Sequence, residues 1–389
     1  MSPDSSFHIV SSTSRCRVAL LGFGTVGSAV ARRLTGADAV RGLQLTHICD
    51  RRADQKRGAV SVAADVTWTQ SVDDVLRSDA DIIVEAIGGL DPATDWIRQA
   101  LLAGKSVVTA NKQVIARDGP SLLTLAARQG RQLRFEAAVG GAMPIVRAIG
   151  DGLAGDRLTR VVAILNGTTN AVLSSMEAGG GSFAEALADA RALGYAEADP
   201  STDLDGGDAA AKLAIICALA FGLRVDPSRI ATRSASAVTA ADFDEARRRG
   251  GTIRQLAYAQ YDRAHGVLTA WVAPVVVPRG SIFARTVGAQ NAAMVTGVHA
   301  GDVTITGAGA GGAATAVAVI SDLVAIARDR AAIVPAPGLS TPRAVLGFEC
   351  EKSSLIATFN AEIAEHAESG RLCEFSGFCV DRRVEAEAV

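Results

Sequence analysis

The first part of the chain alternates between short apolar runs and longer segments whose apolar residues recur at helical spacing. The short runs predict strands at 16–22, 43–49, 81–87, 105–110 and 133–139. Segments between them have apolar positions three and four apart, which predicts amphipathic helices at 26–34, 94–104 and 120–130. Apolar strands separated by helices are typical of a parallel sheet buried on both faces. The pattern therefore predicts an α/β fold with a Rossmann-type doubly wound parallel sheet.

The pattern changes after about residue 140. A strand-like run leads into two helical stretches, and further strand-like runs precede a last strong helix. The expected strands are at 160–166, 271–278, 293–298 and 303–307, and the expected helices are at 183–193, 207–223 and 313–328. This mixture predicts a second domain of the α+β class.

Composition narrows the class of protein. The 389 residues are 49% hydrophobic and 21% charged, which excludes disorder over most of the chain. The formal net charge of -2 gives no sign of nucleic acid or an anionic membrane as a partner. The six cysteines lack CxxC spacing, and no secretory signal or membrane-length apolar segment is visible. We expect a cytoplasmic protein with reduced thiols.

A glycine-rich loop follows the first predicted strand. The segment GFGTVG contains Gly22, Gly24 and Gly27, with Phe23, Thr25 and Val26 between them. In a GxGxxG loop the glycines permit a tight turn, close approach of a pyrophosphate and close helix packing. The free N–H groups of the following helix then face the phosphates. The loop predicts a site for NAD or NADP.

The residues after the second predicted strand bear on the choice of cofactor. Asp50 stands where an acidic residue usually binds the ribose hydroxyls of NAD, while Arg51 could hold the 2′-phosphate of NADP. The alternative is a turn aspartate beside solvated arginines. Ile87 and Gly88, at the end of the next strand on this edge, are expected to border the same cofactor.

An acidic segment precedes the helix predicted at 207–223. Asp208 and Lys212 are four residues apart and share one helix face. Carboxylates so close together repel one another unless a cation or an ammonium group lies among them, which suits a substrate with an α-amino group. A solvated acidic loop is equally compatible, and calcium is disfavoured because the spacing does not match an EF-hand. The five carboxylates are those of Glu197, Asp199, Asp203, Asp205 and Asp208.

Four further segments carry polar or glycine-rich candidates. Lys112 follows a predicted strand at the ligand-binding edge of the sheet, where a lysine could transfer a proton or simply face water. Glu136 precedes a glycine-rich stretch, and carboxylate with carbonyl oxygens is a ligand set for hard cations. The turn at 166–170 could bind a carboxylate or cap a helix, and the glycine loop at 307–312 could face phosphates or only connect.

Six of these blocks occur in the order found in homoserine dehydrogenases, and the chain resembles this family from about residue 17 to residue 328. The acidic block is the most specific. The resemblance implies NAD(P)-dependent interconversion of L-homoserine and L-aspartate 4-semialdehyde, in threonine, methionine and isoleucine biosynthesis. The blocks are GFGTVG, TANK, FEAAVGGAMP, LNGTTN, LGYAEADPSTDLDGGDAAAKLAI and GAGAGGAATAVAVISDL.

The resemblance also implies roles for individual residues. Lys112, Lys212 and Asp208 are expected to be catalytic, with Lys112 as the principal acid or base, and Gly309 is expected to reach the cofactor. A monovalent cation, expected to be Na⁺, is implied at Glu136, Val139, Gly141 and Met143. The implied substrate-binding residues are Glu197, Asp203, Asp208, Lys212, Gly167, Thr168 and Tyr195.

The expected domains follow from pattern and resemblance together. Residues 15–135, completed by 307–330, are expected to bind NAD(P), and residues 136–306 to bind substrate and form a homodimer or higher homo-oligomer. The tail at 331–389 has no assigned role, and it looks too short for the regulatory ACT module of many bacterial relatives. We therefore expect weak or absent inhibition by threonine through that route.

Two rival functions are weighed against this one. A non-catalytic dinucleotide-binding sensor would keep the fold but would not need Lys112, Asp208 and Lys212 together. An aldehyde dehydrogenase would need an activated cysteine nucleophile, and no cysteine lies in a glycine-rich turn beside a base.

Overall fold

The computed structural model describes residues 15–37, 39–58, 62–196, 199–329, 342, 344–346 and 357–358. Its first sheet is parallel and has the strand order β3-β2-β1-β4-β5-β6. The order reverses beside β1, as in a doubly wound dinucleotide-binding fold. The strands are β1 Cys16–Leu21, β2 Leu43–Cys49, β3 Thr67–Thr69, β4 Ile82–Glu85, β5 Ser106–Thr109 and β6 Leu133–Arg134.

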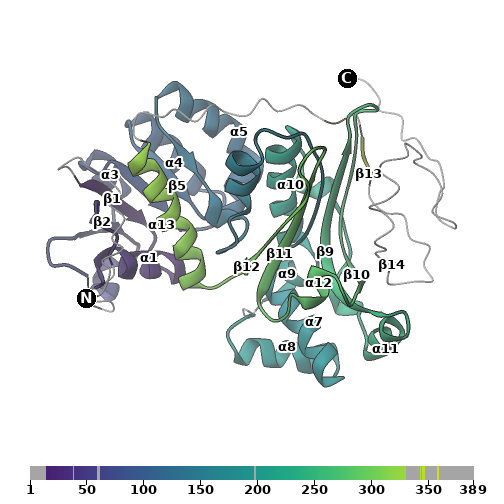
Figure 1. The fold of residues 1–389 in the computed structure, drawn as a ribbon. Coiled ribbons are helices and arrows are strands. Elements are labelled where there is room, and N and C mark those ends of the chain that lie inside the picture. Colours follow the sequence, from purple (N-terminus) through teal and green to yellow (C-terminus); the bar gives the residue numbers. More distant parts are fainter. Residues whose placement is uncertain are drawn as a thin grey trace, which may run out of the picture.

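Helices pack against this sheet, and the last long helix of the chain returns to it. In Figure 1, α13 lies beside α1 although most of the second sheet separates them in sequence. The helices are α1 Thr25–Thr35, α2 Ala53–Lys56, α3 Val72–Arg77, α4 Ala93–Leu102, α5 Lys112–Arg128 and α13 Gly312–Arg328. The predicted Rossmann-type sheet is confirmed.

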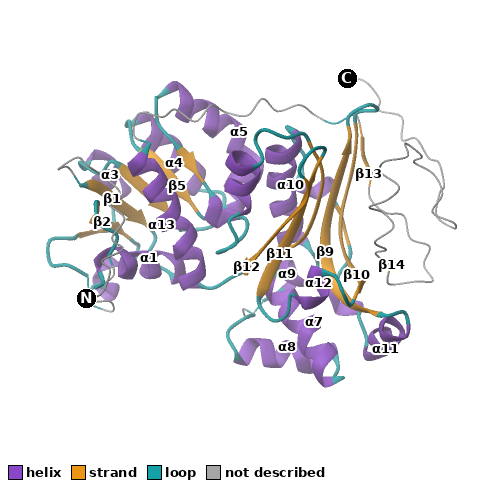
Figure 2. Cartoon of the chain, in the orientation of Figure 1, coloured by secondary structure: helices purple, strands orange, loops and turns teal. Residues whose placement is uncertain are grey.

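The second sheet is mixed and contains long antiparallel strands. Its order is β12-β11-β7-β9-β10-β13, and β8 and β14 also pair with β10. Figure 2 shows it as a separate layer of strands, with α10 on one side. The strands are β7 Leu158–Ile164, β8 Ala231–Thr232, β9 Gly251–Asp262, β10 Val267–Pro278, β11 Gln290–Gly297, β12 Gly301–Ala308, β13 Ala344–Leu346 and β14 Ala357–Thr358.

The helices of this region begin at residues suited to capping. Ser182 starts α8 with a capping box to Glu185, and Thr239 does the same for α11 through Asp242. The helices are α6 Ile145–Arg147, α7 Gly167–Gly179, α8 Phe183–Ala192, α9 Ser201–Leu204, α10 Gly207–Phe221, α11 Ala240–Arg248 and α12 Ile282–Arg285. Short 3-10 turns are η1 Glu136–Ala138, η3 Pro227–Arg229 and η4 Ala235–Ala237, and η2 Ala148–Gly152 is a π turn.

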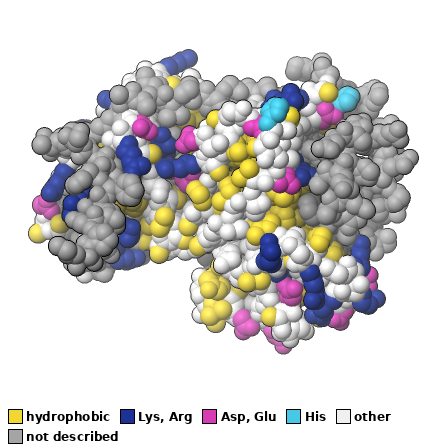
Figure 3. All heavy atoms as spheres, viewed as in Figure 1, with side chains coloured by type: hydrophobic (Ala, Val, Ile, Leu, Met, Phe, Trp, Pro, Cys, Tyr) yellow, Lys and Arg dark blue, Asp and Glu magenta, His cyan; other side chains and the backbone are white. Residues whose placement is uncertain are grey.

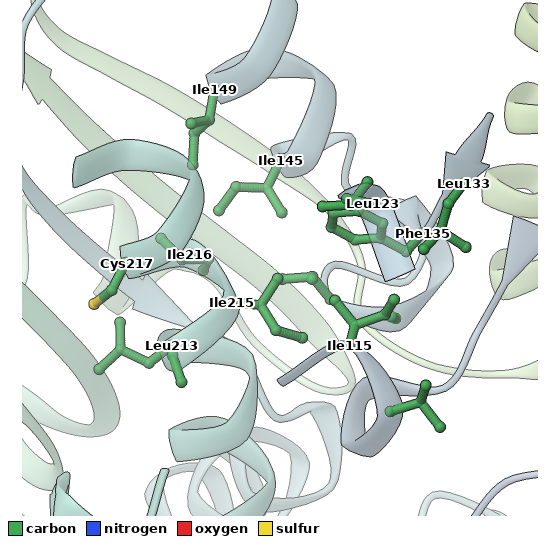
Figure 4. Packing of buried hydrophobic residues seen from close by; sticks show 14 of the residues in the cluster. Ile115, Leu123, Leu133, Phe135, Ile145, Ile149, Leu213, Ile215, Ile216 and Cys217 are labelled. Carbon is green, nitrogen blue, oxygen red and sulfur yellow. The ribbon is translucent and has the colours of Figure 1, made fainter. Parts of the chain in front are cut away.

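One apolar core joins the two regions. Figure 4 shows side chains from α5, β6, α6 and α10 packed together, among them Ile115, Phe135, Ile145 and Ile215. Each is at most 6% exposed. Full burial of one such side chain contributes about 1.5–3 kcal/mol to stability. This core holds α5 against α10. The polar residues at the starts of these two helices are therefore close to each other.

Two local predictions were wrong. The strand expected at 133–139 ends at Arg134, because Glu136 is buried and its carboxylate accepts the N–H groups of Val146 and Arg147, which turns the chain into η1. The helix expected from residue 120 begins at Lys112 and continues through Pro120. At 166–170 the helix-cap alternative is confirmed, because Asn166 caps α7. No helix in the described part of the chain is long and apolar enough to cross a membrane.

Candidate active site

The glycine loop has the backbone geometry that a bound dinucleotide requires. Gly22 has φ +95°, and a Cβ there would lie 2.7 Å from the carbonyl oxygen of Ala86. A Cβ at Gly27 would lie 2.0 Å from the carbonyl oxygen of Gly22, so the helix can approach the loop only with glycine here. Gly24 precedes α1, faces open space and gives the helix no side-chain cap. The first N–H groups of α1 are therefore available to a phosphate.

Asp50 follows β2 and is held by groups on three sides. Its carboxylate accepts the N–H of Phe23 at 2.9 Å and of Arg52 at 2.8 Å, and it pairs with Lys56 Nζ at 2.6 Å. Partial burial opposes ionisation, but Lys56 and the two N–H groups hold the pKa of Asp50 below its ordinary value. The Lys56 ammonium group also donates to the carbonyl of Phe23. Lys56 was not anticipated, although its helix follows directly after Asp50.

Arg51 lies beside this pair on an exposed turn, as does Arg52. On the neighbouring loop, Ile87 is 37% exposed and Gly88 has φ +79°. The N–H groups of these two residues donate to the buried carboxylate of Glu85. The structure therefore brings the loops after β1, β2 and β4 together at one edge of the sheet, as their expected shared role requires.

The centre of the second constellation is Asp208, in the first turn of α10. Its two carboxylate oxygens pair with Lys112 Nζ at 2.8 Å and with Lys212 Nζ at 2.7 Å. The side chain of Asp208 is 4% exposed, that of Lys212 13% and that of Lys112 36%. Burial alone would raise the pKa of Asp208, but the two ammonium groups outweigh it and hold that pKa well below its usual range. Asp208 is therefore a stably charged carboxylate.

Asn166 connects this cluster to the acidic segment. Its Nδ2 donates to Asp203 at 2.8 Å and to Asp208 at 2.9 Å, while its Oδ1 accepts the N–H of Thr169 and caps α7. Lys212 donates to the carbonyl of Leu165 at 2.8 Å. The cap is one of the two roles expected for this turn. The bonds from Asn166 to Asp203 and Asp208 were not predicted, because they join segments that are distant in sequence.

The remaining expected substrate residues lie around the start of α7. The hydroxyl of Thr168 donates to the carbonyl of Tyr195 at 2.7 Å, and the side chain of Tyr195 is exposed. Gly167 packs against the backbone of Ala289, where a Cβ would lie 3.0 Å from the carbonyl oxygen. Glu197 lies outside the described residues. Asp199 and Asp205 are exposed, so they do not join the Asp208 cluster.

The expected cation ligands lie in the turn between η1 and α6. Both carboxylate oxygens of Glu136 accept backbone N–H groups at 2.9 Å, and burial raises the pKa of Glu136 to about 7. The carbonyl of Met143 accepts the N–H of Ile145. Within the described residues, no N–H or O–H group donates to the carbonyls of Val139 and Gly141. Free carbonyl oxygens suit a hard cation, whereas the Glu136 side chain is already bonded.

Gly309 lies in the late glycine loop between β12 and α13. Its N–H donates to the carbonyl of Ala289, and a Cβ at Gly141 would lie 2.5 Å from the carbonyl oxygen of Gly309. The late loop is therefore packed against the expected cation turn. The described contacts place it at the junction of the two sheets, before α13 reaches α1.

The described cysteines give no support to a thiolate mechanism. Cys16, Cys49 and Cys217 are buried. Burial raises the pKa of Cys49 to about 11 and that of Cys217 to about 12, so neither thiol is a thiolate at neutral pH. Cys350, Cys373 and Cys379 lie outside the described residues.

Family comparisons agree with the two-part arrangement. A model described as "Homoserine dehydrogenase, NAD binding domain" matches residues 22–136, and one described as "Homoserine dehydrogenase" matches residues 144–324. The chain is 42% identical to the homoserine dehydrogenase of Mycobacterium tuberculosis over 322 residues, which are 80% of this chain and 72% of the relative. It is 39% identical to that of Corynebacterium glutamicum over 338 residues, covering 83% and 74% of the two chains.

Solved structures give the same result. A homoserine dehydrogenase from Thiobacillus denitrificans superposes with a TM-score of 0.78 at 35% identity, covering 86% of this chain and 80% of that one. A hyperthermophilic archaeal homoserine dehydrogenase in complex with NADPH has a TM-score of 0.66 at 26% identity, covering 80% of this chain and 97% of that one.

Proposed function

The chain belongs to the homoserine dehydrogenase family of NAD(P)-dependent oxidoreductases, and from this premise we propose which of its residues carry the interconversion of L-homoserine and L-aspartate 4-semialdehyde. One observation carries the proposal: Lys112 from the nucleotide-binding sheet and Lys212 from α10 pair with the same buried carboxylate, Asp208. A buried charge costs free energy unless it is paired, and here both ammonium groups pair with the buried carboxylate of Asp208. Its two ammonium groups face a reacting oxygen from two sides.

Lys112 is the proposed acid and base. Its side chain is the more exposed of the two lysines, and it starts α5 at the edge of the sheet where the glycine loop also lies. Lys212 is held by both Asp208 and the carbonyl of Leu165, which suits a fixed charge. In the reducing direction, the aldehyde oxygen gains negative charge, which both ammonium groups stabilise, and Lys112 then donates a proton to it. In the reverse direction Lys112 removes the hydroxyl proton.

The amino-acid part of the substrate is assigned to the acidic side of the cluster. Asp203, with Glu197 as the implied second carboxylate, is the proposed partner of the α-ammonium group, and Asn166 holds Asp203 in place. The N-terminal N–H groups of α7, at Gly167 and Thr168, are the proposed donors to the substrate carboxylate. The hydroxyl of Thr168 donates to the carbonyl of Tyr195 and so holds Tyr195 near the start of α7.

The nicotinamide cofactor supplies or accepts the hydride when bound. The residues present fit a dinucleotide, because Gly24 leaves open space that a Cβ would fill and α1 begins without a side-chain cap. We propose a preference for NADP(H) over NAD(H). Lys56 neutralises Asp50, and Arg51 adds an exposed cation at the same turn, which favours a 2′-phosphate.

The experiment for activity and cofactor choice is one assay. Initial rates of homoserine oxidation, followed by the absorbance of the reduced nicotinamide, are measured with NADP and with NAD for the unaltered chain, Lys112→Ala and Arg51→Ala. We expect turnover with NADP above that with NAD, loss of turnover in Lys112→Ala, and a smaller cofactor preference in Arg51→Ala. Cofactor binding without homoserine-dependent turnover in the unaltered chain would instead support the sensor alternative.

We also propose a monovalent cation, taken to be Na⁺, bound mainly by backbone carbonyls at Val139 and Gly141. Met143 and Glu136 flank it, and the carboxylate of Glu136 helps by fixing the turn through Val146 and Arg147. The thermal midpoint should rise in NaCl relative to tetramethylammonium chloride of equal ionic strength. Equal midpoints in the two salts would oppose the proposal.

A homodimer through the second sheet is proposed from the face opposite α10. Tyr258 and Trp271 lie in register on β9 and β10 and stack with ring centroids 5.0 Å apart. Val162 and Met294 continue this row across the sheet. Trp271 and Met294 are half-buried and accessible to a second copy, whereas Tyr258 and Val162 are buried within one chain. Figure 3 shows hydrophobic side chains gathered over the middle of the second sheet on the face in view. Sedimentation equilibrium should give twice the chain mass, and Trp271→Glu should shift it toward the monomer.

The proposed biological place of the reaction is cytoplasmic synthesis of threonine, methionine and isoleucine. The family membership and the small-molecule substrate support it. Expression of the chain in a bacterial strain without homoserine dehydrogenase should restore growth in medium lacking threonine and methionine, and the Lys112→Ala variant should not. Growth with the variant would oppose the assignment of Lys112.

A further inference from the structure

Glu85 is a buried carboxylate that the reaction does not use directly. It ends β4, is 0% exposed and accepts three hydrogen bonds: from the N–H of Ile87 at 2.8 Å, the N–H of Gly88 at 3.3 Å and the hydroxyl of Thr109 at 2.5 Å. In the described part of the chain no cationic side chain pairs with it. Burying a carboxylate that has only neutral hydrogen-bond donors costs folding free energy. A role for Glu85 beyond packing would account for its presence.

The hydrogen bonds continue from Thr109 to the start of α5. The N–H of Asn111 donates to the hydroxyl oxygen of Thr109 at 3.0 Å, and Asn111 Nδ2 donates to the carbonyl of Gly89 at 2.6 Å. Asn111 Oδ1 caps α5 by accepting the N–H of Val114. The bonds therefore form a closed ring that runs from Glu85 through Thr109 and Asn111 to Gly89 and back along the loop.

The ring lies between the cofactor loop and Lys112. On one side, Ala86 follows Glu85, its N–H donates to the carbonyl of Leu21, and its carbonyl abuts Gly22. On the other side, Asn111 directly precedes Lys112, whose Nζ lies 2.8 Å from Asp208. The ring thus fixes the start of α5 relative to the floor of the dinucleotide loop.

We propose that Glu85, acting through Thr109 and Asn111, is the positioning residue for Lys112, and that it sets the place of the ammonium group relative to the bound cofactor. This inference rests on the proposed acid–base role of Lys112. Preorganisation has a large effect, because displacement of a reacting group by about 1 Å can lower the rate on the order of a hundredfold.

The polarity of the ring explains why a carboxylate is present. The hydroxyl oxygen of Thr109 already accepts the N–H of Asn111, so the hydroxyl proton needs an acceptor. Glu85 supplies one. A glutamine could still accept the N–H groups of Ile87 and Gly88 through its carbonyl oxygen, but its amide group would then point donors at Thr109. Glu85→Gln therefore leaves the hydroxyl proton of Thr109 without its acceptor, and is expected to weaken the branch toward Lys112 and to spare the branch toward the cofactor loop.

The test compares Thr109→Val with Thr109→Ser. Valine keeps the shape and removes the hydroxyl, whereas serine keeps the hydroxyl. Thr94→Val is the matched control, because Thr94 is also buried in this domain and its hydroxyl donates to the carbonyl of Leu90. The same hydroxyl also contacts Asp118 and Arg117 on α5, so the control removes hydrogen bonds to α5 that lie outside the ring. Each variant, together with Glu85→Gln and Lys112→Ala, is measured for kcat, KM for homoserine, pH dependence of kcat, NADPH dissociation constant and thermal midpoint.

We expect Thr109→Val and Glu85→Gln to lower kcat by about tenfold to a hundredfold and to shift the pH dependence of kcat, with the NADPH dissociation constant nearly unchanged. Thr109→Ser should restore most of the rate, and Thr94→Val should lower only the thermal midpoint. If Thr109→Val and Glu85→Gln match Thr94→Val, with a lower midpoint, normal kcat and an unmoved pH profile, Glu85 is merely structural and the inference is wrong. Normal turnover in Lys112→Ala would instead remove the proposed role of Lys112 itself.

Discussion

The two halves of the proposed site are built from different kinds of chemical group. The half built on the first sheet uses backbone: Gly22, Gly24 and Gly27 shape the turn into α1, the first N–H groups of α1 are left available, and a Cβ at Gly24 would fill the open space beside them. The half built on α7 and α10 uses side chains: Asp208 and Lys212 form a mostly buried ion pair, and Asn166 connects Asp208 to Asp203 of the acidic segment. Lys112 belongs to the first half by chain position and to the second by contact.

The difference teaches where each half is vulnerable. In the backbone half, a substitution that adds a side chain should lower the affinity for the cofactor. In the side-chain half, a substitution that removes a charge should lower turnover and change the pH dependence of stability. A variant in one half that changes the property assigned to the other half would contradict this division.

The largest expected effect is on turnover in Asp208→Asn. An asparagine cannot pair with two ammonium groups, so we expect kcat/KM for homoserine to fall on the order of 10³-fold, while the NADPH dissociation constant stays within about twofold. Asp205→Asn, an exposed neighbour in the same segment, is the control and should retain normal rates. A parallel loss of NADPH affinity in Asp208→Asn would show that the halves are not separable.

The same substitution should change the pH dependence of stability. Because the folded-state pKa of Asp208 lies below its ordinary value of about 3.9, its ion pairs contribute stability above that pH and lose it as the pH falls through the folded-state pKa. The unaltered chain should exceed Asp208→Asn by about 2–3 kcal/mol in unfolding free energy near neutral pH. In urea titrations this difference should begin to shrink below about pH 5 and should continue to shrink as the pH falls toward the folded-state pKa. A constant difference would mean that Asp208 is not held charged.

A pair of glycine variants tests the backbone half. A Cβ at Gly27 would meet the carbonyl oxygen of Gly22, so Gly27→Ala should lower the unfolding free energy by about 1–3 kcal/mol. A Cβ at Gly24 meets nothing within 4 Å, so Gly24→Ala should keep its thermal midpoint and weaken NADPH binding about tenfold or more. Calorimetry measures the stability of each variant, and fluorescence titration measures its affinity for NADPH. Equal NADPH affinity in Gly24→Ala and the unaltered chain would count against a phosphate at this loop.

The smallest expected effect concerns Thr168. Thr168→Val removes the hydrogen bond to the carbonyl of Tyr195, which is worth about 1 kcal/mol, so KM for homoserine should rise about fivefold. Thr168→Ser should restore the original KM. An unchanged KM in Thr168→Val would mean that Tyr195 does not take part in substrate binding. The substrate-binding residues would then be limited to those around Asp208.

How far each half could be predicted follows from the same contrast. The glycine loop and the strands before and after it are local patterns, and the structure places β1, β2 and α1 where the spacing predicts them. Asp208 and Lys212 are close in sequence, so their pairing was also predictable. The ion pair between Lys112 and Asp208 depends on how α5 packs against α10, which no local pattern specifies.

The misses have equally specific causes. Glu136 carries a strand-like sequence context but turns the chain, because its buried carboxylate captures two distant N–H groups. Lys56 pairs with Asp50 only because a short helix follows β2. In the sequence Glu85 is one polar residue at the end of an apolar strand. Its hydrogen bond with Thr109 forms only because β4 and β5 are neighbouring strands.

The most direct test of the central claim is the crystal structure of the chain with NADP and homoserine bound. The account predicts that the reacting hydroxyl lies within about 2.6–3.2 Å of Lys112 Nζ, next to the nicotinamide and with Asp208 still joined to both lysines. A bound homoserine whose hydroxyl contacts neither Lys112 nor Lys212 would contradict the account.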